Sequence, residues 1–206
     1  FANDPRFEVV VGSTEGETIL AMNNARPPLD NVKVREAIAH AIDRQAIIDG
    51  AMFGYGTPIG THFAPHHPDY VDLTGQSDHD PEKARQLLAE AGVGEVTLSL
   101  KLPPVEGYAR RGGEIIASQL AAVGIKTQTT NLEWAQWLEH VFGGKDFDLT
   151  IISHTEPLDI NIYGRDDYYF GYKSEAFKQI MTDLGNETDP AKRSELFKAA
   201  QRQIAD

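Results

Sequence analysis

The chain has no cysteine, and basic side chains are scarce among its 206 residues. The absence of cysteine excludes disulfide bonds, thiolate metal sites and a cysteine nucleophile. Lysine and arginine together number 19 against 31 aspartate and glutamate residues, which gives a formal net charge of −12. Nucleic acids and anionic membranes attract basic surfaces, so we expect neither of them as a partner.

Long apolar runs are also missing, which argues against a membrane-spanning helix. The hydrophobic content of 41% is nevertheless ordinary for a folded domain with a buried core. The sequence opens at Phe1 without an initiator methionine or a basic-then-apolar leader, and it breaks off inside a helical pattern at Asp206. From these features we expect a fragment of a longer protein.

The first half of the sequence predicts a hairpin followed by helices. The two β-like runs are Phe7–Val11 and Glu17–Met22. Asp30 is the expected N-cap of a helix whose apolar positions recur at helical spacing through Ile42. A second helix is expected over Arg44–Met52. The segment Ile59–His79 is rich in proline, histidine, aspartate and glycine, which predicts a long irregular loop.

The second half predicts a β-α-β-α-β unit between two helices that open at Asp80-Pro81 and Asp189-Pro190. The expected strands are Val96–Leu102, Ile125–Thr130 and Phe147–Ser153. The expected helices are Glu106–Val123, in which Gly112-Gly113 allows close packing, and a helix from a cap at Asn131 to Phe142 that buries Trp134, Leu138 and Val141. This order of elements predicts adjacent parallel strands and an α/β fold.

Open α/β sheets bind ligands beyond the carboxyl ends of their strands. The third strand runs into a polar and aromatic segment, His154–Tyr172, which we take as the candidate recognition surface. The candidate ligand-binding residues are His154, Glu156, Asp159, Tyr163, Tyr168 and Tyr169. The competing interpretation is that the aromatic side chains only cover a helix face.

The histidines raise the question of a metal site. His62, His66 and His67 share one loop, with Asp69 and His79 nearby, but adjacent histidines are not a helical ligand pair and no His-Glu-x-x-His motif occurs. A hydrogen-bonded surface loop explains them, so no metal and no cofactor is expected.

No acid in the sequence lies within a catalytic motif. Glu36 and His40 are four residues apart on a helix, which is more typical of a solvated pair than of an acid–base dyad. Ser153 and His154 are neighbours on a strand and point to opposite faces, so they do not form a nucleophile–base pair. We therefore expect a binding protein, with no catalytic residues, and not an enzyme.

Six sequence motifs in order carry a family resemblance. They are NNARPPLDNVKVREAIAHAIDRQAI, GYGTPIG, DHDPEKARQLLAEAG, EIIASQLAAVGIKTQ, FDLTIIS and ETDPAKRSELFKAAQ. The set resembles the C-terminal lobe of the extracellular solute-binding proteins of ABC importers, in the subgroup that binds dipeptides, oligopeptides and nickel (family 5). The resemblance covers nearly all of the chain from about Glu17 onward.

The resemblance implies a periplasmic-binding-protein-like lobe with a β-α-β-α-β core and additional N-terminal strands and helices. The whole chain, 1–206, is then one lobe. Its expected parts are a hairpin near the hinge (1–22), a helical and loop region (23–92), the core (93–155), and the recognition loop with C-terminal helices (156–206).

The resemblance further implies a monomer outside the cytoplasm, in the periplasm or its equivalent. An absent N-terminal lobe of the same chain, preceded by a signal peptide, would enclose the ligand from the other side. The receptor would deliver its solute to an ABC permease in the membrane.

For peptide-binding members, the resemblance implies an Asp that pairs with the ligand's amino group, in a segment that begins Gly-Trp. Ser153-His154 replaces Gly-Trp here, and the acids within reach are Asp159, which lies nearest the family position, and Glu156. A short peptide is the expected ligand. Nickel chelates, oligosaccharides and opine-like compounds are the alternatives.

Overall fold

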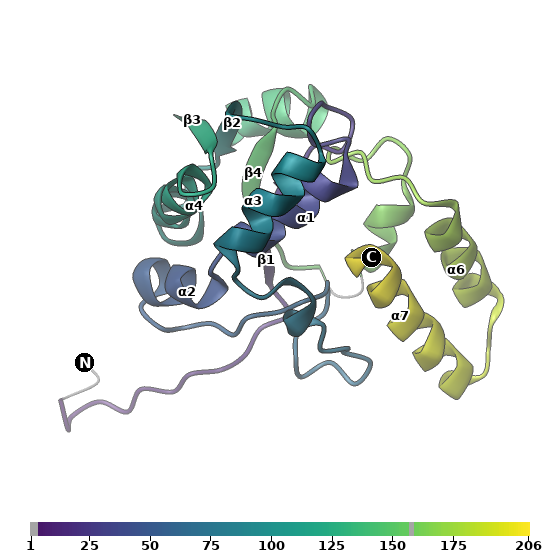
Figure 1. The fold of residues 1–206 in the computed structure, drawn as a ribbon. Helices are drawn as coiled ribbons and strands as arrows, with labels where there is room; N and C mark the ends of the chain where they lie inside the picture. The colour runs from purple at the N-terminus through teal and green to yellow at the C-terminus, as the bar shows by residue number, and fades with distance from the viewer. Residues whose placement is uncertain (1–3, 157–158) are drawn as a thin grey trace.

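A four-stranded sheet forms the centre of the molecule in the computed structural model, which describes residues 4–156 and 159–206 (Figure 1). The strands are β1 (Glu17–Met22), β2 (Val96–Leu102), β3 (Ile125–Asn131) and β4 (Leu149–His154). Their order is β1-β4-β2-β3. As predicted, β2 is parallel to both β3 and β4, while β1 pairs with β4 in the antiparallel sense.

Helices cover the sheet. The α-helices are α1 (Val32–Ala41), α2 (Arg44–Met52), α3 (Pro81–Glu90), α4 (Gly112–Ala121), α5 (Trp134–Gln136), α6 (Glu175–Asn186) and α7 (Pro190–Ala205). The 3₁₀-helices are η1 (Thr74–Ser77) and η4 (Asp159–Gly164), and the π-helical segments are η2 (Glu106–Arg111) and η3 (Trp137–Gly143). Figure 1 shows α1 beside α3 over the sheet, and α6 paired with α7 at one side of the molecule. Helix α6 lies in the region 156–206, where C-terminal helices were expected, but its bounds were not predicted.

The predicted hairpin is wrong in its first strand. Residues 4–16 form an extended arm that runs away from the body (Figure 1), and Val10 and Val11 on it are 82% and 66% exposed. The β-like run Phe7–Val11 has no partner strand in the described residues, and the strand beside β1 is β4. Strand propensity alone does not make a strand.

Two helix starts differ from the expected ones. The N-cap of α1 is Asn31, whose side chain accepts a hydrogen bond from the Lys33 amide at 3.0 Å, and not Asp30. The helix after β3 is capped by Glu133, in a reciprocal capping box with Gln136, and not by Asn131. In both cases the chain after the expected cap continues for one or two residues before it turns into the helix.

Packing against the two faces of the sheet produces two apolar cores. On β4, Leu149 and Ile151 belong to the core under α1, α3 and α4, while Ile152 belongs to a second, aromatic core. In the first core, Gly113 on α4 lies close to β2, and an added Cβ there would lie 2.5 Å from Leu102 Cδ1. The expectation of close packing is thus confirmed for Gly113, whereas a Cβ on Gly112 would make only an ordinary contact, 3.7 Å from Ile47.

Of the three side chains expected to be buried on the helix after β3, only Val141 is. Trp134 and Leu138 are 43% and 54% exposed, whereas Trp137 and Val141 are buried in the aromatic core. Trp137 takes the inward position, where its indole N–H also donates to Thr150 Oγ1 of β4 at 3.0 Å.

A buried glutamine attaches the long loop 59–79 to α7. Gln201 is fully buried, and its Oε1 accepts hydrogen bonds from Thr61 Oγ1 and from the Val71 amide, each at 3.0 Å. Its Nε2 donates to the Asp69 carbonyl at 2.7 Å. Apart from η1 the loop is irregular, as predicted, and this glutamine orders it.

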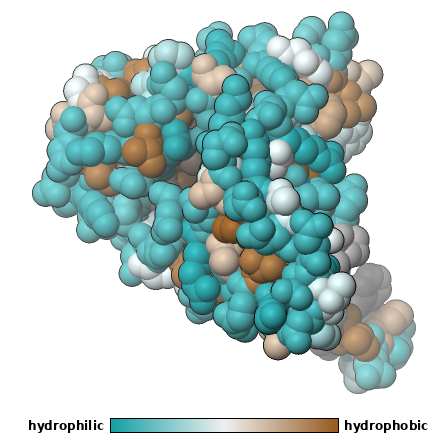
Figure 2. Space-filling view, turned by 90° about the vertical axis from the view of Figure 1, so that its right-hand side faces the viewer, coloured by the Kyte–Doolittle hydropathy of each residue, from teal (hydrophilic) through white to brown (hydrophobic). Residues whose placement is uncertain are grey.

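The side of the molecule that carries α6 and α7 is mainly hydrophilic, with a few small hydrophobic patches (Figure 2). This surface agrees with the acidic composition of the chain. Among the described residues, no helix combines the length and the apolar character that crossing a membrane requires.

Candidate functional site

The end of β4 brings together two histidines and two acids from four separate segments. His154 is the last residue of β4 and lies opposite Glu17, the first residue of β1, in the antiparallel ladder. Asp159 opens η4 just beyond β4, and His62 comes from the long loop. We call these four residues the carboxylate–imidazole cluster.

Asp159 is held by both imidazoles of the cluster. Its Oδ1 lies 2.5 Å from His62 Nε2, and its Oδ2 lies 3.2 Å from His154 Nδ1. The remaining ring nitrogens also have partners: Tyr163 Oη is 3.2 Å from His62 Nδ1, and Tyr169 Oη is 3.5 Å from His154 Nε2. The two rings are therefore fixed in orientation by contacts on both sides.

The electrostatics of Asp159 follow from this arrangement. Burial opposes ionisation, but the hydrogen bonds from His154 and His62, and the positive charge of these rings when protonated, lower the pKa of Asp159 below its ordinary value. Burial raises the pKa of the Tyr163 phenol, so this hydroxyl stays neutral. Asp159 is thus an ionised acid whose two oxygens are already engaged.

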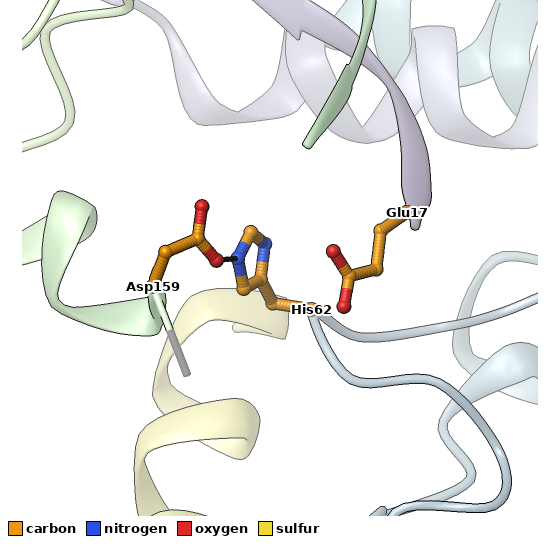
Figure 3. A group of neighbouring side chains, drawn as sticks. All are labelled: Glu17, His62 and Asp159. Atoms are coloured by element: carbon orange, nitrogen blue, oxygen red, sulfur yellow. Dashed lines mark hydrogen bonds and ion pairs between the residues drawn. The ribbon is translucent and has the colours of Figure 1, made fainter. Parts of the chain in front are cut away.

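Glu17 is the least satisfied member of the cluster. It is only 5% exposed, and its Oε2 is buried without a hydrogen-bond partner in the part of the chain that the structure describes. Burial, and then the charge of Asp159, raise the pKa of Glu17 to about 8. In Figure 3 the carboxylates of Glu17 and Asp159 flank the ring of His62.

The structure also places the other predicted site residues. Glu156 is exposed and accepts a hydrogen bond from the Thr155 amide at 3.3 Å. Tyr168 is partly buried, with its ring centroid 6.5 Å from that of His154, while Tyr169 is 2% exposed within the aromatic core. All six candidates thus lie around one strand end, at different depths. Residues 157 and 158 of the same segment lie outside the described residues.

Sequence reasoning missed Glu17 altogether and considered His62 only with its loop neighbours. The signal for Glu17 was the two-residue period of β1, which puts it on the same face as Ile19 and Ala21 of the aromatic core. No comparable signal exists for His62, because only the folded loop brings it to Asp159.

The other loop histidines do not converge on one point. His66 pairs with Glu15 on the surface, and His67 packs on the Phe63 ring at 4.4 Å between centroids. His79 Nδ1 lies 3.9 Å from an Asp43 carboxylate oxygen.

The expectation that His40 and Glu36 form a solvated pair is wrong. His40 is 7% exposed, and its Nδ1 lies 2.8 Å from the Asp78 carbonyl oxygen, while Glu36 is exposed. The reason is that α1 packs against the segment leading into α3, which covers this part of the helix.

An open hollow of about 1770 Å³ adjoins the cluster. Glu17, His62 and Tyr163 line it together with residues of β1, α1, α2 and the long loop. The hollow is large enough for a small organic ligand.

Comparison with known proteins identifies the family. A family model described as "Bacterial extracellular solute-binding proteins, family 5 Middle" matches residues 1–158. The chain belongs to this family. Solved structures share its fold: the ABC transporter-associated periplasmic binding protein DppA of Helicobacter pylori, in complex with the peptide STSA, has a TM-score of 0.85 at 22% identity. That match covers 93% of this chain and 40% of that protein.

Curated relatives of this family-5 protein are binding proteins of several kinds. "Di/tripeptide-binding protein 1" of Pseudomonas aeruginosa is 29% identical over 196 residues, which are 88% of this chain and 36% of that protein. "Heme-binding protein A" of Haemophilus influenzae is 27% identical over 212 residues, which are 96% of this chain and 39% of that protein. The chain therefore spans less than two fifths of the length of these relatives.

Proposed function

We propose that this chain is one lobe of a two-lobed receptor that captures a small polar solute, foremost a di- or oligopeptide, for an ABC importer. The receptor works outside the cytoplasm, as a monomer, and hands its solute to a membrane permease. Membership of family 5 supports the role, and the peptide-binding relatives support the solute class. A second lobe, from elsewhere in the same protein, closes over the ligand.

An exposed acid at the carboxyl end of β4 carries the peptide assignment. Both oxygens of Asp159 are engaged by imidazoles, whereas Glu156 is exposed and accepts one bond from a backbone amide. We therefore assign to Glu156 the charge-assisted hydrogen bond with the peptide's ammonium group. Tyr168, partly buried beside the cluster, offers the neighbouring apolar surface.

Binding without chemistry is sufficient for this role. The solute is expected to leave the receptor unchanged, and none of the residues of the cluster is assigned a catalytic step. Nickel chelates, oligosaccharides and opine-like compounds are the competing solutes, and the same experiment separates them.

The test uses the complete protein that contains this lobe. Mass spectrometry identifies what copurifies with it, and calorimetric titration then compares free with N-acetylated di- and tripeptides. We expect free peptides to bind and acetylated ones to bind at least about tenfold more weakly, because acetylation removes the ammonium charge. Glu156→Gln is expected to weaken binding to a similar extent, while Glu114→Gln, an exposed acid on α4, leaves it unchanged.

Two outcomes would count against the proposal. Binding of a sugar or a chelate in place of any peptide would overturn the solute class. Peptide binding that is equal in Glu156→Gln and in the unmodified protein would overturn the role given to Glu156.

A further inference from the structure

We propose that Glu17, His62 and Asp159 form a binding site for a divalent transition-metal ion, with Zn²⁺ as the best-fitting ion. A nitrogen of His62 and one carboxylate oxygen from each acid all lie within 4.8 Å of one another. The ion would be a bare cation held by the chain's own side chains. Binding of this ion would require no peptide and would be a property separate from solute capture.

The donor set selects the class of ion. One imidazole with two carboxylates matches the mixed nitrogen and oxygen ligands of Zn²⁺, with a position left for water or solute. Imidazole also suits nickel and copper, whereas Mg²⁺ and Ca²⁺ prefer oxygen ligands throughout. Two carboxylates balance the charge of a divalent cation.

The unpaired oxygen of Glu17 is an independent pointer to a ligand. A buried carboxyl oxygen without a hydrogen-bond partner costs free energy, and native structures rarely leave one in that state. Glu17 is 5% exposed, and its Oε2 has no partner among the described residues. A cation between Glu17 and His62, which face one another in Figure 3, would supply that partner.

The surrounding contacts provide the support that metal ligands need. The ion would replace the proton between His62 Nε2 and Asp159 Oδ1, while His62 Nδ1 keeps Tyr163 Oη at 3.2 Å. His154 Nδ1, 3.2 Å from Asp159 Oδ2, holds the other oxygen of this carboxylate. Such outer partners fix the orientation of liganding histidines and carboxylates.

The ion would join three segments that are far apart in the sequence. Glu17 begins β1, His62 lies in the long loop and Asp159 begins η4. Because the unfolded chain does not hold these groups together, binding stabilises the folded state, and the melting temperature should rise with the concentration of the ion.

The experiment is a calorimetric titration of the chelator-treated chain with ZnCl₂ alone, without peptide. We expect one Zn²⁺ per chain and a rise in melting temperature. Glu17→Gln and His62→Gln should each weaken binding at least about tenfold, as loss of even an outer partner does. The matched control is His66→Gln, which changes an exposed histidine of the same loop, paired with Glu15, and should leave binding unchanged.

Several results would overturn the proposal. They are an absence of binding at micromolar Zn²⁺, undiminished binding in His62→Gln, or loss of binding in His66→Gln. An equal loss in Glu156→Gln would assign the ion to the neighbouring group of His154, Glu156 and Asp159, and would also refute it.

A crystal of the unmodified chain grown with Zn²⁺ gives an answer that does not depend on whether the variants fold. An anomalous peak between Glu17, His62 and Asp159 supports the site, and a peak elsewhere or none refutes it. Peptide is absent from both experiments. A negative result for Zn²⁺ would therefore not contradict the proposed solute capture.

Discussion

Glu17 makes the stability of the fold depend on pH. Its pKa is about 8 in the folded chain against an ordinary value of 4.5, because the carboxyl is buried and faces Asp159, with Glu15 and Glu156 nearby. The folded state therefore keeps a proton that the unfolded chain loses. This contribution to stability is fully present below about pH 4.5 and disappears as the pH rises through about 8.

We expect Glu17→Gln to flatten this dependence. A glutamine side chain at this position has no proton to lose, so the free energy of unfolding of the variant, relative to the original chain, should rise between pH 5 and pH 8 by at least about 1.4 kcal/mol, the value of one pKa unit. Urea unfolding at a series of pH values, in a chelator-containing buffer, measures the difference. Parallel curves for the two proteins would contradict the raised pKa.

Among single residues, the sequence pointed to two members of the carboxylate–imidazole cluster. His154 and Asp159 follow a predicted strand, so they could be found from the rule that ligands bind beyond strand ends. The sequence could not show that Glu17 and His62 lie beside these two residues. The pairing of β1 with β4 and the path of the long loop are set by the tertiary structure. Local patterns carry no information on such contacts.

The attachment of loop 59–79 to α7 rests on Gln201. Gln201→Leu keeps the size of the side chain but leaves the Val71 amide and the Asp69 carbonyl without their partner. We expect a loss of about 2–3 kcal/mol in the free energy of unfolding, since unpaired buried polar groups are costly. Chemical denaturation measures it.

The matched control for this prediction is Gln179→Leu. Gln179 is exposed on α6 and bonds only Asp183 on its own helix among the described residues. We expect a change within about 0.5 kcal/mol, as is usual for surface substitutions. A similar loss in both variants would show that Gln201 has no special role.

Helices and strands with a clear cap or a regular apolar pattern in the sequence were predicted well. Segments whose structure depends on pairing with another strand were not. Helix α3 begins at Pro81 after the cap Asp80, as expected, and β2 spans Val96–Leu102 as expected. The arm segment Phe7–Val11 is rich in β-branched valines, as strands are, but has no neighbour to pair with among the described residues. Whether such a segment becomes a strand depends on the rest of the fold.

The molecule as a whole consists of a packed body and the arm of residues 4–16. We expect a protease at low concentration to cut within residues 8–14, because the backbone there is extended and outside the sheet. The truncated body, which keeps β1 from Glu17, should retain the melting temperature within about 2 °C. Mass spectrometry locates the cut, and calorimetry compares the two forms; a cut inside the body would contradict this division.

The strand order has a last consequence, for self-association. With the order β1-β4-β2-β3, strand β3 is an outer strand and leaves one row of backbone groups unpaired by the sheet. Lys126, Gln128 and the residues from Thr129 to Asn131 are exposed along it. A short outer strand with a lysine and polar side chains is a poor template for a strand from another molecule, so this edge resists aggregation.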